Sequence, residues 1–282
     1  MKIYILLVAL IISSCNSHQN LENDEKYNQI ITKYSEIKEI VSKEVDDTFY
    51  VYVRLPKAYT KNPDKKYPVL YLLDGDISFN MATSIVRYLQ FGKSVPDLII
   101  VAPGYGTMLS DKETNYRERD YTTSKVERFT KSGEGKKYLS FLKNELIPMV
   151  QSSYRTDKKR ILNGYSIGGL FTINTLLEEP DLFTDYIAGS PYLINDLDSL
   201  KTRAQTFYLN NEKKLFMSVG ELEENKFYHI PINNIYNLIQ NKRKLTSKFS
   251  VFENGTHFTC PSEALSYGLK FVFSPTTVEE QD

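Results

Sequence analysis

Short, almost wholly apolar runs alternate with amphipathic stretches along the body of this chain, and the alternation leaves few folds open to it. Residues 68–73 (PVLYLL) and 97–102 (DLIIVA) are typical of buried parallel strands, and residues 77–89 between them have helical spacing. Further strands are predicted at 160–163, 186–189, 215–219 and 248–252, and further helices at 136–150, 167–177, 230–241 and 263–271. Strands that alternate with helices in this way predict an α/β fold with a mostly parallel central sheet and helices on both of its faces.

Patterning also predicts where the domain starts and ends. Residues 35–45 and 48–55 alternate polar and apolar side chains, as strands with one solvent-facing side do. No internal repeat and no linker rich in Pro, Gly or Ser divides the body of the chain, so we expect one domain over residues 27–274 and a polar tail at 275–282. Residues 104–135 interrupt the rhythm with little periodicity, and a loop of that length in a compact domain usually serves function.

The first residues of the chain are typical of an export signal. A lysine is followed by an apolar run over residues 3–12, whose length as a helix, about 15 Å, is half the thickness of a bilayer. The stretch that ends at Cys15 (ISSC) resembles the lipobox of bacterial lipoproteins, which implies cleavage before Cys15 and lipid attachment to its sulfur. We therefore expect a lipoprotein signal peptide at residues 1–14 and a polar tether at 15–26. The protein would then sit in the cell envelope, held at a membrane by its lipid anchor only.

The balance of charges and the few metal-binding side chains exclude several classes of protein. Lys plus Arg and Asp plus Glu both number 35, so the net charge is zero and the basic surplus of a nucleic-acid binder is absent. Three histidines and two cysteines, without a CxxC pair, exclude a His-rich metal site and a disulfide framework. We therefore expect no nucleic-acid partner and no bound metal.

A Gly-x-Ser-x-Gly motif, Gly164-Tyr165-Ser166-Ile167-Gly168, lies between a predicted strand and a predicted helix. A serine on so tight a turn needs flanking residues without a Cβ, and its hydroxyl then projects above the carboxyl edge of the sheet. The N-terminus of the following helix favours negative charge that develops there. This context predicts Ser166 as a nucleophile. The alternative is a glycine-rich turn that only packs the helix closely on the strand.

A serine nucleophile requires a base, and the chain offers His18, His229 and His257. His18 lies in the predicted tether, outside the domain. His257 directly follows the last predicted strand, and in this architecture the chain order is nucleophile, acid, base. We therefore predict His257 as the base and His229, near the start of a helix, as a surface histidine.

The acid that orients the base is expected after the strand at residues 215–219, where the chain is rich in glutamate. A carboxylate there would hold the imidazole in the correct tautomer. Glu223, the third residue after the glycine that ends the strand, is the first candidate, and Glu224 and Glu221 follow. The alternative is that this acidic run is a solvated loop and that serine and histidine act as a dyad.

Two backbone N–H groups are needed to stabilise a tetrahedral oxyanion. We predict that Ile167, the residue after the nucleophile, supplies one and that Asp76, in the turn after the strand at residues 68–73, supplies the other. The side chains of Asp74 and Asp76 have a second interpretation as a pair of metal ligands. Two close carboxylates on such a turn more often cap a helix, so we expect no metal here.

Taken together, these segments resemble the bacterial putative-esterase family of α/β-hydrolases, which includes siderophore esterases, S-formylglutathione hydrolases and feruloyl esterases. The matching segments occur in the same order and cover nearly the whole predicted domain: YPVLYLLDGD (67–76), RERDYT (117–122), KKYLSFLKNELIPMV (136–150), GYSIGGLF (164–171), AGSPYL (188–193), SVGELEEN (218–225) and NGTHF (254–258). The resemblance implies the α/β-hydrolase fold. It also implies the roles of nucleophile for Ser166, base for His257 and acid for a residue near Glu223.

The same resemblance implies a serine carboxylester hydrolase that works without a cofactor, through an acyl-enzyme, outside the cytoplasm. The LLDGD and SVGELE segments are most similar to the siderophore-esterase branch, which implies a siderophore ester as substrate. The alternatives are removal of acetyl or feruloyl groups from glycans, and acyl transfer by the same residues. The chain has 21 Tyr and no Trp, so Tyr121 and Tyr192 are our candidates for aromatic contacts with the substrate.

The loop at residues 104–135 is expected to border the substrate pocket, because ligands of α/β folds bind at the carboxyl edge of the sheet. If the loop is extended at Arg117 and Arg119, both side chains point to one face, and one of them could bind an anionic group of the substrate. The alternative is that an arginine pairs with Asp120 or Glu118 and only fixes the loop.

Overall fold

The computed structural model describes residues 32–107 and 115–275. The predicted signal peptide at residues 1–14, the tether at 15–26 and all but one residue of the tail at 275–282 lie outside the described residues. Within the described ranges, no helix is both long enough and apolar enough to cross a membrane.

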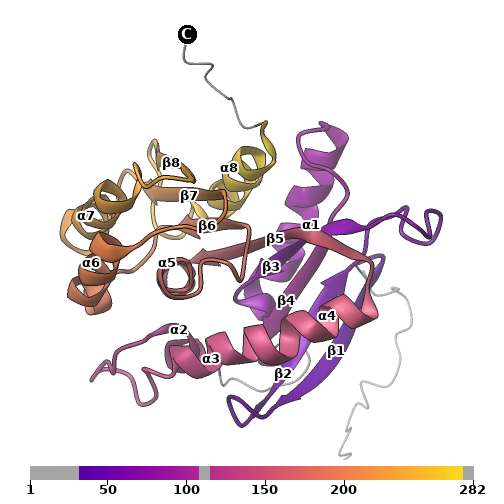
Figure 1. Cartoon of the computed structure of the whole chain (residues 1–282), viewed down its shortest axis with the longest axis horizontal. Helices are drawn as coiled ribbons and strands as arrows, with labels where there is room; N and C mark the ends of the chain where they lie inside the picture. The colour runs from indigo at the N-terminus through magenta and orange to yellow at the C-terminus, as the bar shows by residue number, and fades with distance from the viewer. Residues whose placement is uncertain (1–31, 108–114, 276–282) are drawn as a thin grey trace, which may run out of the picture. The chain divides into compact units, whose positions relative to one another are not determined.

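A single eight-stranded sheet forms the centre of the fold, in the order β1-β2-β4-β3-β5-β6-β7-β8 (Figure 1). Its strands are β1 (Ser35–Ser42), β2 (Asp47–Arg54), β3 (Tyr67–Leu72), β4 (Ile99–Gly104), β5 (Thr156–Tyr165), β6 (Asp185–Gly189), β7 (Lys213–Gly220) and β8 (Leu245–Phe252). Strands β3 to β8 are parallel, whereas β1 and β2 join the edge in antiparallel register. This confirms the predicted α/β fold with a mostly parallel sheet.

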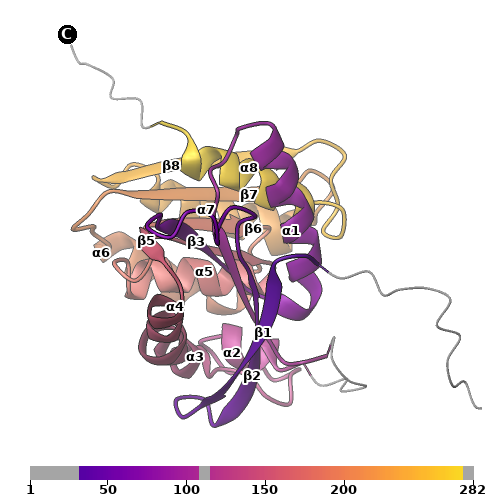
Figure 2. The ribbon, with the colours of Figure 1, turned by 90° about the vertical axis from the view of Figure 1, so that its right-hand side faces the viewer.

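Helices cover both faces of the sheet (Figures 1 and 2). The longer ones are α1 (Gly75–Phe91), α3 (Gly135–Phe141), α4 (Ile147–Ser153), α5 (Ile167–Glu178), α6 (Leu197–Thr206), α7 (Ile230–Ile239) and α8 (Pro261–Phe273). Helices α1 and α8 pack on one face and the others pack on the opposite face. The alternation along β3 explains this arrangement, because Val69 and Tyr71 belong to one buried cluster and Leu70 and Leu72 to the other.

Four local features differ from the sequence-based prediction. The helix predicted at residues 136–150 runs from α3 through a π-helical turn, η1 (Leu142–Leu146), into α4. The loop at residues 104–135 contains a short helix, α2 (Arg117–Tyr121), and α6 was not predicted at all. The low apolar content of α6 hides it, because only Leu200 and Ala204 of this helix are buried. Strand β1 ends at Ser42 rather than at residue 45, in a turn where Asp46 has φ 59°.

The residues that follow the parallel strands lie together at one edge of the sheet. Asp74 follows β3, Ser166 follows β5 and Ser190 follows β6, each at the carboxyl end of its strand. Glu223 comes shortly after β7, and His257 after β8. Residues separated by up to 183 positions in the chain therefore meet at the carboxyl edge, as the predicted parallel order requires (257 − 74 = 183).

Helix α5 begins so close to β5 that a side chain does not fit between them. A Cβ added at Gly164 would lie 2.1 Å from the carbonyl oxygen of Gly168, and a Cβ at Gly169 would lie 2.9 Å from the carbonyl oxygen of Gly189. At Gly168 itself the nearest atom, Asp74 Oδ2, is 3.2 Å away. The first glycine of the motif is therefore the most constrained sterically, and it permits the turn that carries Ser166.

We predict that Gly164→Ala lowers the free energy of unfolding by about 3 kcal/mol or more, because the helix must move away from the strand. Equilibrium urea unfolding would measure this. Gly92→Ala is the matched control, since a Cβ at Gly92 would meet no atom closer than 3.7 Å and its φ is −77°. Equal stability of the Gly164 variant and the wild type would contradict the steric argument.

Candidate active site

The turn between β5 and α5 holds Ser166 in a strained conformation, with φ 59° and ψ −119°. Its backbone N–H donates to the carbonyl oxygen of Gly189 at 3.0 Å, which ties the turn to the neighbouring strand. Strain of this kind persists only where the surroundings hold it, and here the close approach of α5 does so. The Ser166 side chain is partly exposed at the carboxyl edge of the sheet.

Three side chains from separate connections form one hydrogen-bonded series. The hydroxyl of Ser166 lies 3.0 Å from Nε2 of His257. Nδ1 of the same imidazole lies 2.8 Å from Oε2 of Glu223. If Nδ1–H donates to the carboxylate, Nε2 is left as the acceptor for the serine proton. The structure therefore brings together the predicted nucleophile, the predicted base and the first candidate for the acid.

Glu223 is buried, but its carboxylate is well supplied with donors. Oε1 accepts a 2.5 Å hydrogen bond from the hydroxyl of Ser190 and a 2.9 Å hydrogen bond from the backbone N–H of Gly220. Burial raises the pKa of Glu223, but the hydrogen bonds from His257, Ser190 and Gly220 outweigh burial, so the net pKa lies below its ordinary value. The carboxylate stays ionised beside the imidazole.

The alternative candidates for acid and base lie elsewhere. Glu221 and Glu224 are exposed, and Oε2 of Glu221 accepts from the backbone N–H of Asn254 at 2.8 Å. His229 is partly exposed in the helical turn before α7, and within the described residues its imidazole contacts neither Ser166 nor a carboxylate. Glu223 is thus the glutamate that reaches His257.

Two backbone N–H groups, in the first turns of α5 and α1, have no acceptor among the described contacts. In α5 the first hydrogen bond to Ser166 O is donated by Leu170, which leaves the N–H of Ile167 unpaired among the described contacts. In α1 the first donors are Ile77 and Ser78, both to Asp74 O, so the N–H of Asp76 is unpaired in the same sense. These are the two donors that the sequence predicted. Both lie in the first turn of a helix, where N–H groups lack intrahelical acceptors.

The two aspartates after β3 are both engaged in hydrogen bonds. Asp76 is buried and accepts from the Tyr52 hydroxyl at 2.6 Å and from the Tyr105 backbone N–H at 2.6 Å. Asp74 accepts two hydrogen bonds from Arg117 and does not cap α1 through its side chain. Among the described residues there is no cluster of three or more potential metal ligands.

The two arginines predicted to contact substrate are both paired with carboxylates. Nε and one terminal nitrogen of Arg117 bind Asp74 at 2.8 and 3.0 Å. Arg119 binds Asp120 and Asp47, at 2.7 and 2.8 Å for the closest pairs. The expected extended segment is the helix α2, so the two arginines do not share a face and the alternative of an arginine that fixes the loop describes Arg119.

The two tyrosines predicted to contact substrate differ in position. Tyr121 is fully buried, and its hydroxyl accepts from the backbone N–H of Asp74, so the prediction that it contacts substrate is wrong. Tyr192 is partly exposed, and its backbone N–H donates to the carbonyl oxygen of Ser166 at 3.0 Å. Tyr192 therefore lies directly beside the candidate nucleophile.

Comparison with known proteins decides the family. The model of the family described as "Putative esterase" matches residues 42–258, well over half of the chain. The chain belongs to this esterase family. It is 26% identical over 265 residues to the ferri-bacillibactin esterase BesA of Bacillus subtilis, across 86% of this chain and 90% of that protein. It is 31% identical over 169 residues to the apo-salmochelin esterase of Escherichia coli, across 56% of this chain and 52% of that protein.

Solved structures agree with this assignment. The BES protein of Bacillus cereus superposes with a TM-score of 0.75 at 26% identity, across 87% of this chain and 98% of that one. The siderophore hydrolase EstB of Aspergillus nidulans has the same fold, with a TM-score of 0.75 at 22% identity over 86% of this chain and 96% of that one. The protein is therefore a serine esterase of the α/β-hydrolase fold that acts on carboxylic esters.

Sequence reasoning missed two residues that support the site of this esterase. Ser190 is fully buried, has φ 36°, and donates to Glu223. The hydroxyl of Tyr165, the residue before Ser166, donates to the carbonyl oxygen of His257 at 2.8 Å and lies 3.0 Å from Ser190 Oγ. No pattern in the sequence marks either role, because both depend on strands that become neighbours only in the sheet.

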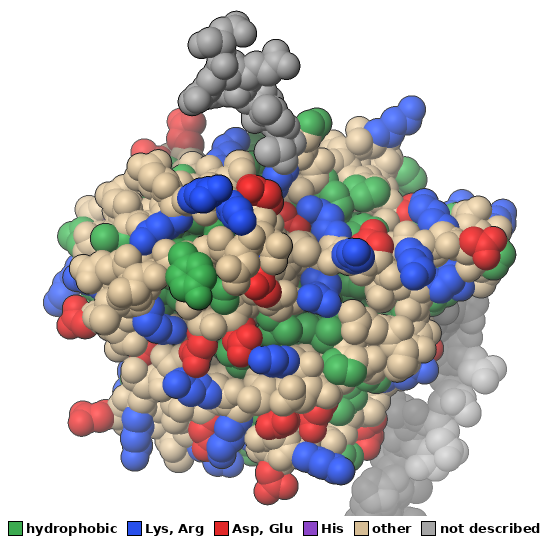
Figure 3. All heavy atoms as spheres, in the orientation of Figure 1, with side chains coloured by type: hydrophobic (Ala, Val, Ile, Leu, Met, Phe, Trp, Pro, Cys, Tyr) green, Lys and Arg blue, Asp and Glu red, His purple; other side chains and the backbone are tan. Residues whose placement is uncertain are grey.

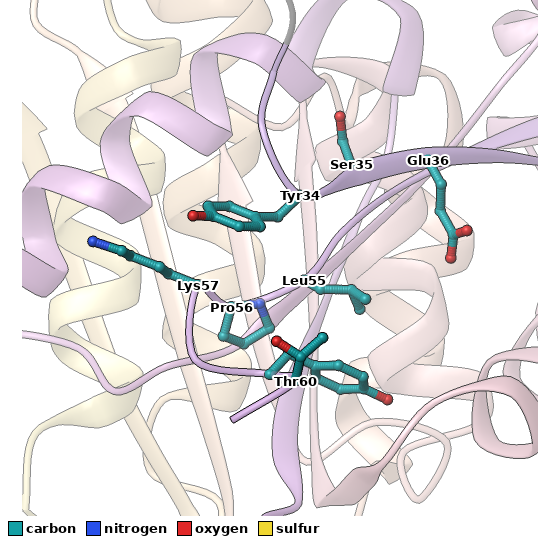
Figure 4. Close-up of a pocket in the computed structure, with 8 residues that line it drawn as sticks. Tyr34, Ser35, Glu36, Leu55, Pro56, Lys57 and Thr60 are labelled. Carbon is teal, nitrogen blue, oxygen red and sulfur yellow. The ribbon is translucent and has the colours of Figure 1, made fainter. Parts of the chain in front are cut away.

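Two hollows among the described residues do not contain the site. One, of about 180 Å³, is lined by residues from the start of β1 and from the end of β2 onward, among them Tyr34, Leu55 and Thr60 (Figure 4). The end of β2 pairs with the start of β4, since Arg54 lies opposite Ile100. This hollow is therefore at the amino edge of the parallel strands, away from Ser166.

We predict that Glu223→Gln lowers kcat by roughly two to four orders of magnitude, because the amide cannot stabilise the imidazolium or fix its tautomer. Glu224→Gln, one residue away and exposed, is the matched control and should keep nearly full activity. Steady-state hydrolysis of a nitrophenyl ester measures both. Near-full activity of the Glu223 variant would show that serine and histidine act as a dyad.

We further predict that Ser190→Ala lowers kcat by about tenfold or more, because a buried carboxylate loses one of its donors. With that donor gone the pKa of Glu223 rises, so the acid limb of the kcat–pH profile moves to higher pH. Ser218→Ala is the control: Ser218 is also fully buried, its carbonyl accepts from the N–H of Ser190, and its hydroxyl has no partner among the described residues. The same profile for both variants would refute this role of Ser190.

Proposed function

We propose that this esterase hydrolyses ester bonds of siderophores through an acyl-enzyme formed on Ser166. The observation that supports the mechanism is the hydrogen-bonded series from Glu223 through His257 to Ser166. It lies at the carboxyl edge of the sheet, with the N–H groups of Ile167 and Asp76 unpaired nearby. Nucleophile, base, orienting acid and oxyanion donors are then all present without a cofactor.

In the proposed reaction His257 takes the proton of Ser166 as the hydroxyl oxygen attacks the ester carbonyl carbon. The carbonyl oxygen becomes an oxyanion, which the two helix N-termini stabilise. His257 then gives its proton to the leaving alkoxide, and the acyl group stays on the serine. In the second half His257 deprotonates a water molecule, whose oxygen attacks the acyl carbon. The bond to the serine oxygen then breaks, that oxygen takes the proton back from His257, and the acid is released. Glu223 stays ionised throughout and stabilises the imidazolium.

The names of the relatives support a siderophore ester as substrate, since BesA is a ferri-bacillibactin esterase and the Escherichia coli relative an apo-salmochelin esterase. Partly exposed tyrosines beside Ser166 suit an aromatic ligand, although the chain lacks tryptophan. Hydrolysis of acetyl or feruloyl esters on glycans is the alternative on the same residues, and so is transfer of the acyl group to an alcohol.

We also propose that the protein acts outside the cytoplasm, lipid-anchored in the cell envelope. The support is the sequence of residues 1–15, a positive start, a short apolar run and a cysteine. Labelling of cells with a radioactive fatty acid would test this, with Cys15→Ser as the unlabelled control.

The mixed surface charge fits a small-molecule substrate better than a nucleic acid. Figure 3 shows Lys and Arg side chains interspersed with Asp and Glu side chains over the described part of one face. The net charge of the whole chain is zero. A surface of this kind gives no extended positive field for a phosphate backbone.

We predict that Ser166→Ala reduces ester hydrolysis by several orders of magnitude while its midpoint of thermal unfolding stays close to that of the wild type. Intact mass after treatment with a fluorophosphonate should increase for the wild type and not for the variant. More than a tenth of the wild-type activity in Ser166→Ala would refute the assignment.

The wild type and the Ser166→Ala variant also serve to test the substrate class. Ferri-bacillibactin, its iron-free ligand, acetylated xylan and a feruloylated oligosaccharide are compared by kcat/KM, with and without an added alcohol. A preference for the siderophore esters supports the proposal. A preference for a glycan ester, or an ester product formed with the alcohol, contradicts it.

A further inference from the structure

Among the described residues, one arginine of the loop before α3 has no carboxylate partner. Arg128 is exposed, and within the described residues no Asp or Glu lies at ion-pair distance from it. Arg117 and Arg119, from the same loop region, are both bound to aspartates. Because a guanidinium keeps its charge at any physiological pH, Arg128 places an unneutralised positive charge at this position.

The backbone around Arg128 is held in a closed turn. The N–H of Phe129 donates to the carbonyl oxygen of Val126 at 3.0 Å. The N–H of Val126 donates to the hydroxyl of Ser132 at 2.8 Å. Phe129 also packs against the main hydrophobic core. The arginine therefore extends from a fixed point.

The guanidinium of Arg128 lies over two aromatic rings, one of which adjoins the nucleophile. Its Cζ is 4.7 Å from the ring centroid of Phe129 and 5.4 Å from that of Tyr192. The backbone N–H of Tyr192 donates to the carbonyl oxygen of Ser166. The side chain of Tyr192 thus lies between the guanidinium of Arg128 and Ser166. Stacking on a ring leaves the edge N–H groups of a guanidinium free to donate.

Partly exposed aromatic rings lie in series between Arg128 and the predicted base, His257. The ring centroids of Tyr192 and Tyr228 are 5.6 Å apart, and those of Tyr228 and His257 are 4.9 Å apart. Burial raises the pKa of Tyr228 to about 12, the negative charge of Glu223 adds to this, and the positive charge of Arg128 opposes it. The arginine is thus near enough to act electrostatically on a ring that contacts His257.

We propose that Arg128, with Tyr192 and Tyr228 as the flanking rings, binds an anionic oxygen group of the substrate while its ester carbonyl lies at Ser166. This inference rests on the proposed function and specifies the class of ester: one that carries a negative charge near an acyl group. The planar fork of donors suits a carboxylate, a hydroxamate or a phenolate. The rings cover the apolar part of the ligand between the two ends.

Two esters that differ only in charge test the subsite. Mono(4-nitrophenyl) glutarate carries a free carboxylate on its acyl chain, and its methyl ester is the neutral counterpart. The quantity measured is the ratio of kcat/KM for the charged ester to that for the neutral ester. We expect Arg128→Ala to lower this ratio by about tenfold, mainly through KM of the charged ester. Arg128→Lys should restore part of it, since a point charge remains but the fork is lost.

Arg87→Ala is the matched control. Arg87 is also exposed and stacks on a ring, with Cζ 5.4 Å from the centroid of Phe91, but it lies about three turns along α1 from the site. We expect its ratio to equal that of the wild type. Added NaCl should lower the wild-type ratio and leave that of Arg128→Ala nearly unchanged, because the attraction is screened.

An unchanged ratio in Arg128→Ala, or an equal fall in Arg87→Ala, would overturn the subsite. Ser166→Ala in the same assay tests the proposed function separately. If Ser166→Ala abolishes hydrolysis of both esters and the ratio does not respond to Arg128, the esterase mechanism stands and the anionic subsite fails. If Ser166→Ala retains hydrolysis, the mechanism itself fails.

Discussion

The site depends on the hydrogen bonds that stabilise one buried carboxylate, that of Glu223. Glu223 lies in the interior next to an imidazole, and an ion so placed is stable only when hydrogen bonds replace its lost hydration. Its donors come from three separate connections: Gly220 at the end of β7, Ser190 after β6 and His257 after β8. These contacts require the sheet to bring those ends together in one register. The orientation of the imidazole toward Ser166 follows from them.

Backbone strain gathers at the same edge of the sheet. Asp74, Ser166 and Ser190 each have a positive φ without being glycine, and each lies just past the end of a parallel strand. Such conformations cost about 1–3 kcal/mol apiece, so they persist because neighbouring contacts hold them. The arginine that binds Asp74 and the close packing of α5 on β5 supply those contacts.

The arginines between residues 117 and 128 are of two kinds. Arg117 and Arg119 pair with carboxylates, whereas Arg128 is exposed to solvent. Arg117 and Arg119 hold α2 against the body of the domain through Asp74 and Asp47, and Arg119 also pairs with Asp120 within α2. Their partly or fully buried positions need these partners, because an unpaired buried guanidinium would be costly. Arg128 is exposed and needs no such partner. The exposure of its side chain thus distinguishes Arg128, which we propose binds substrate, from the two arginines that pair with carboxylates.

The fold, the nucleophile and the base could be predicted because they rest on local signals: apolar runs of strand length, the Gly-x-Ser-x-Gly turn, and a histidine after the last strand. The same signals left Glu223 one candidate among neighbouring glutamates, because all of them follow β7 and only register with β8 selects the one that faces His257. The pairing of Arg117 with Asp74 and of Arg119 with Asp47 could not be predicted, because these carboxylates are distant in the chain. Ser190 and Tyr165 were invisible for the same reason. Local patterning determined the elements and their order, whereas side-chain pairings across strands were decided by tertiary packing, which no short-range pattern encodes.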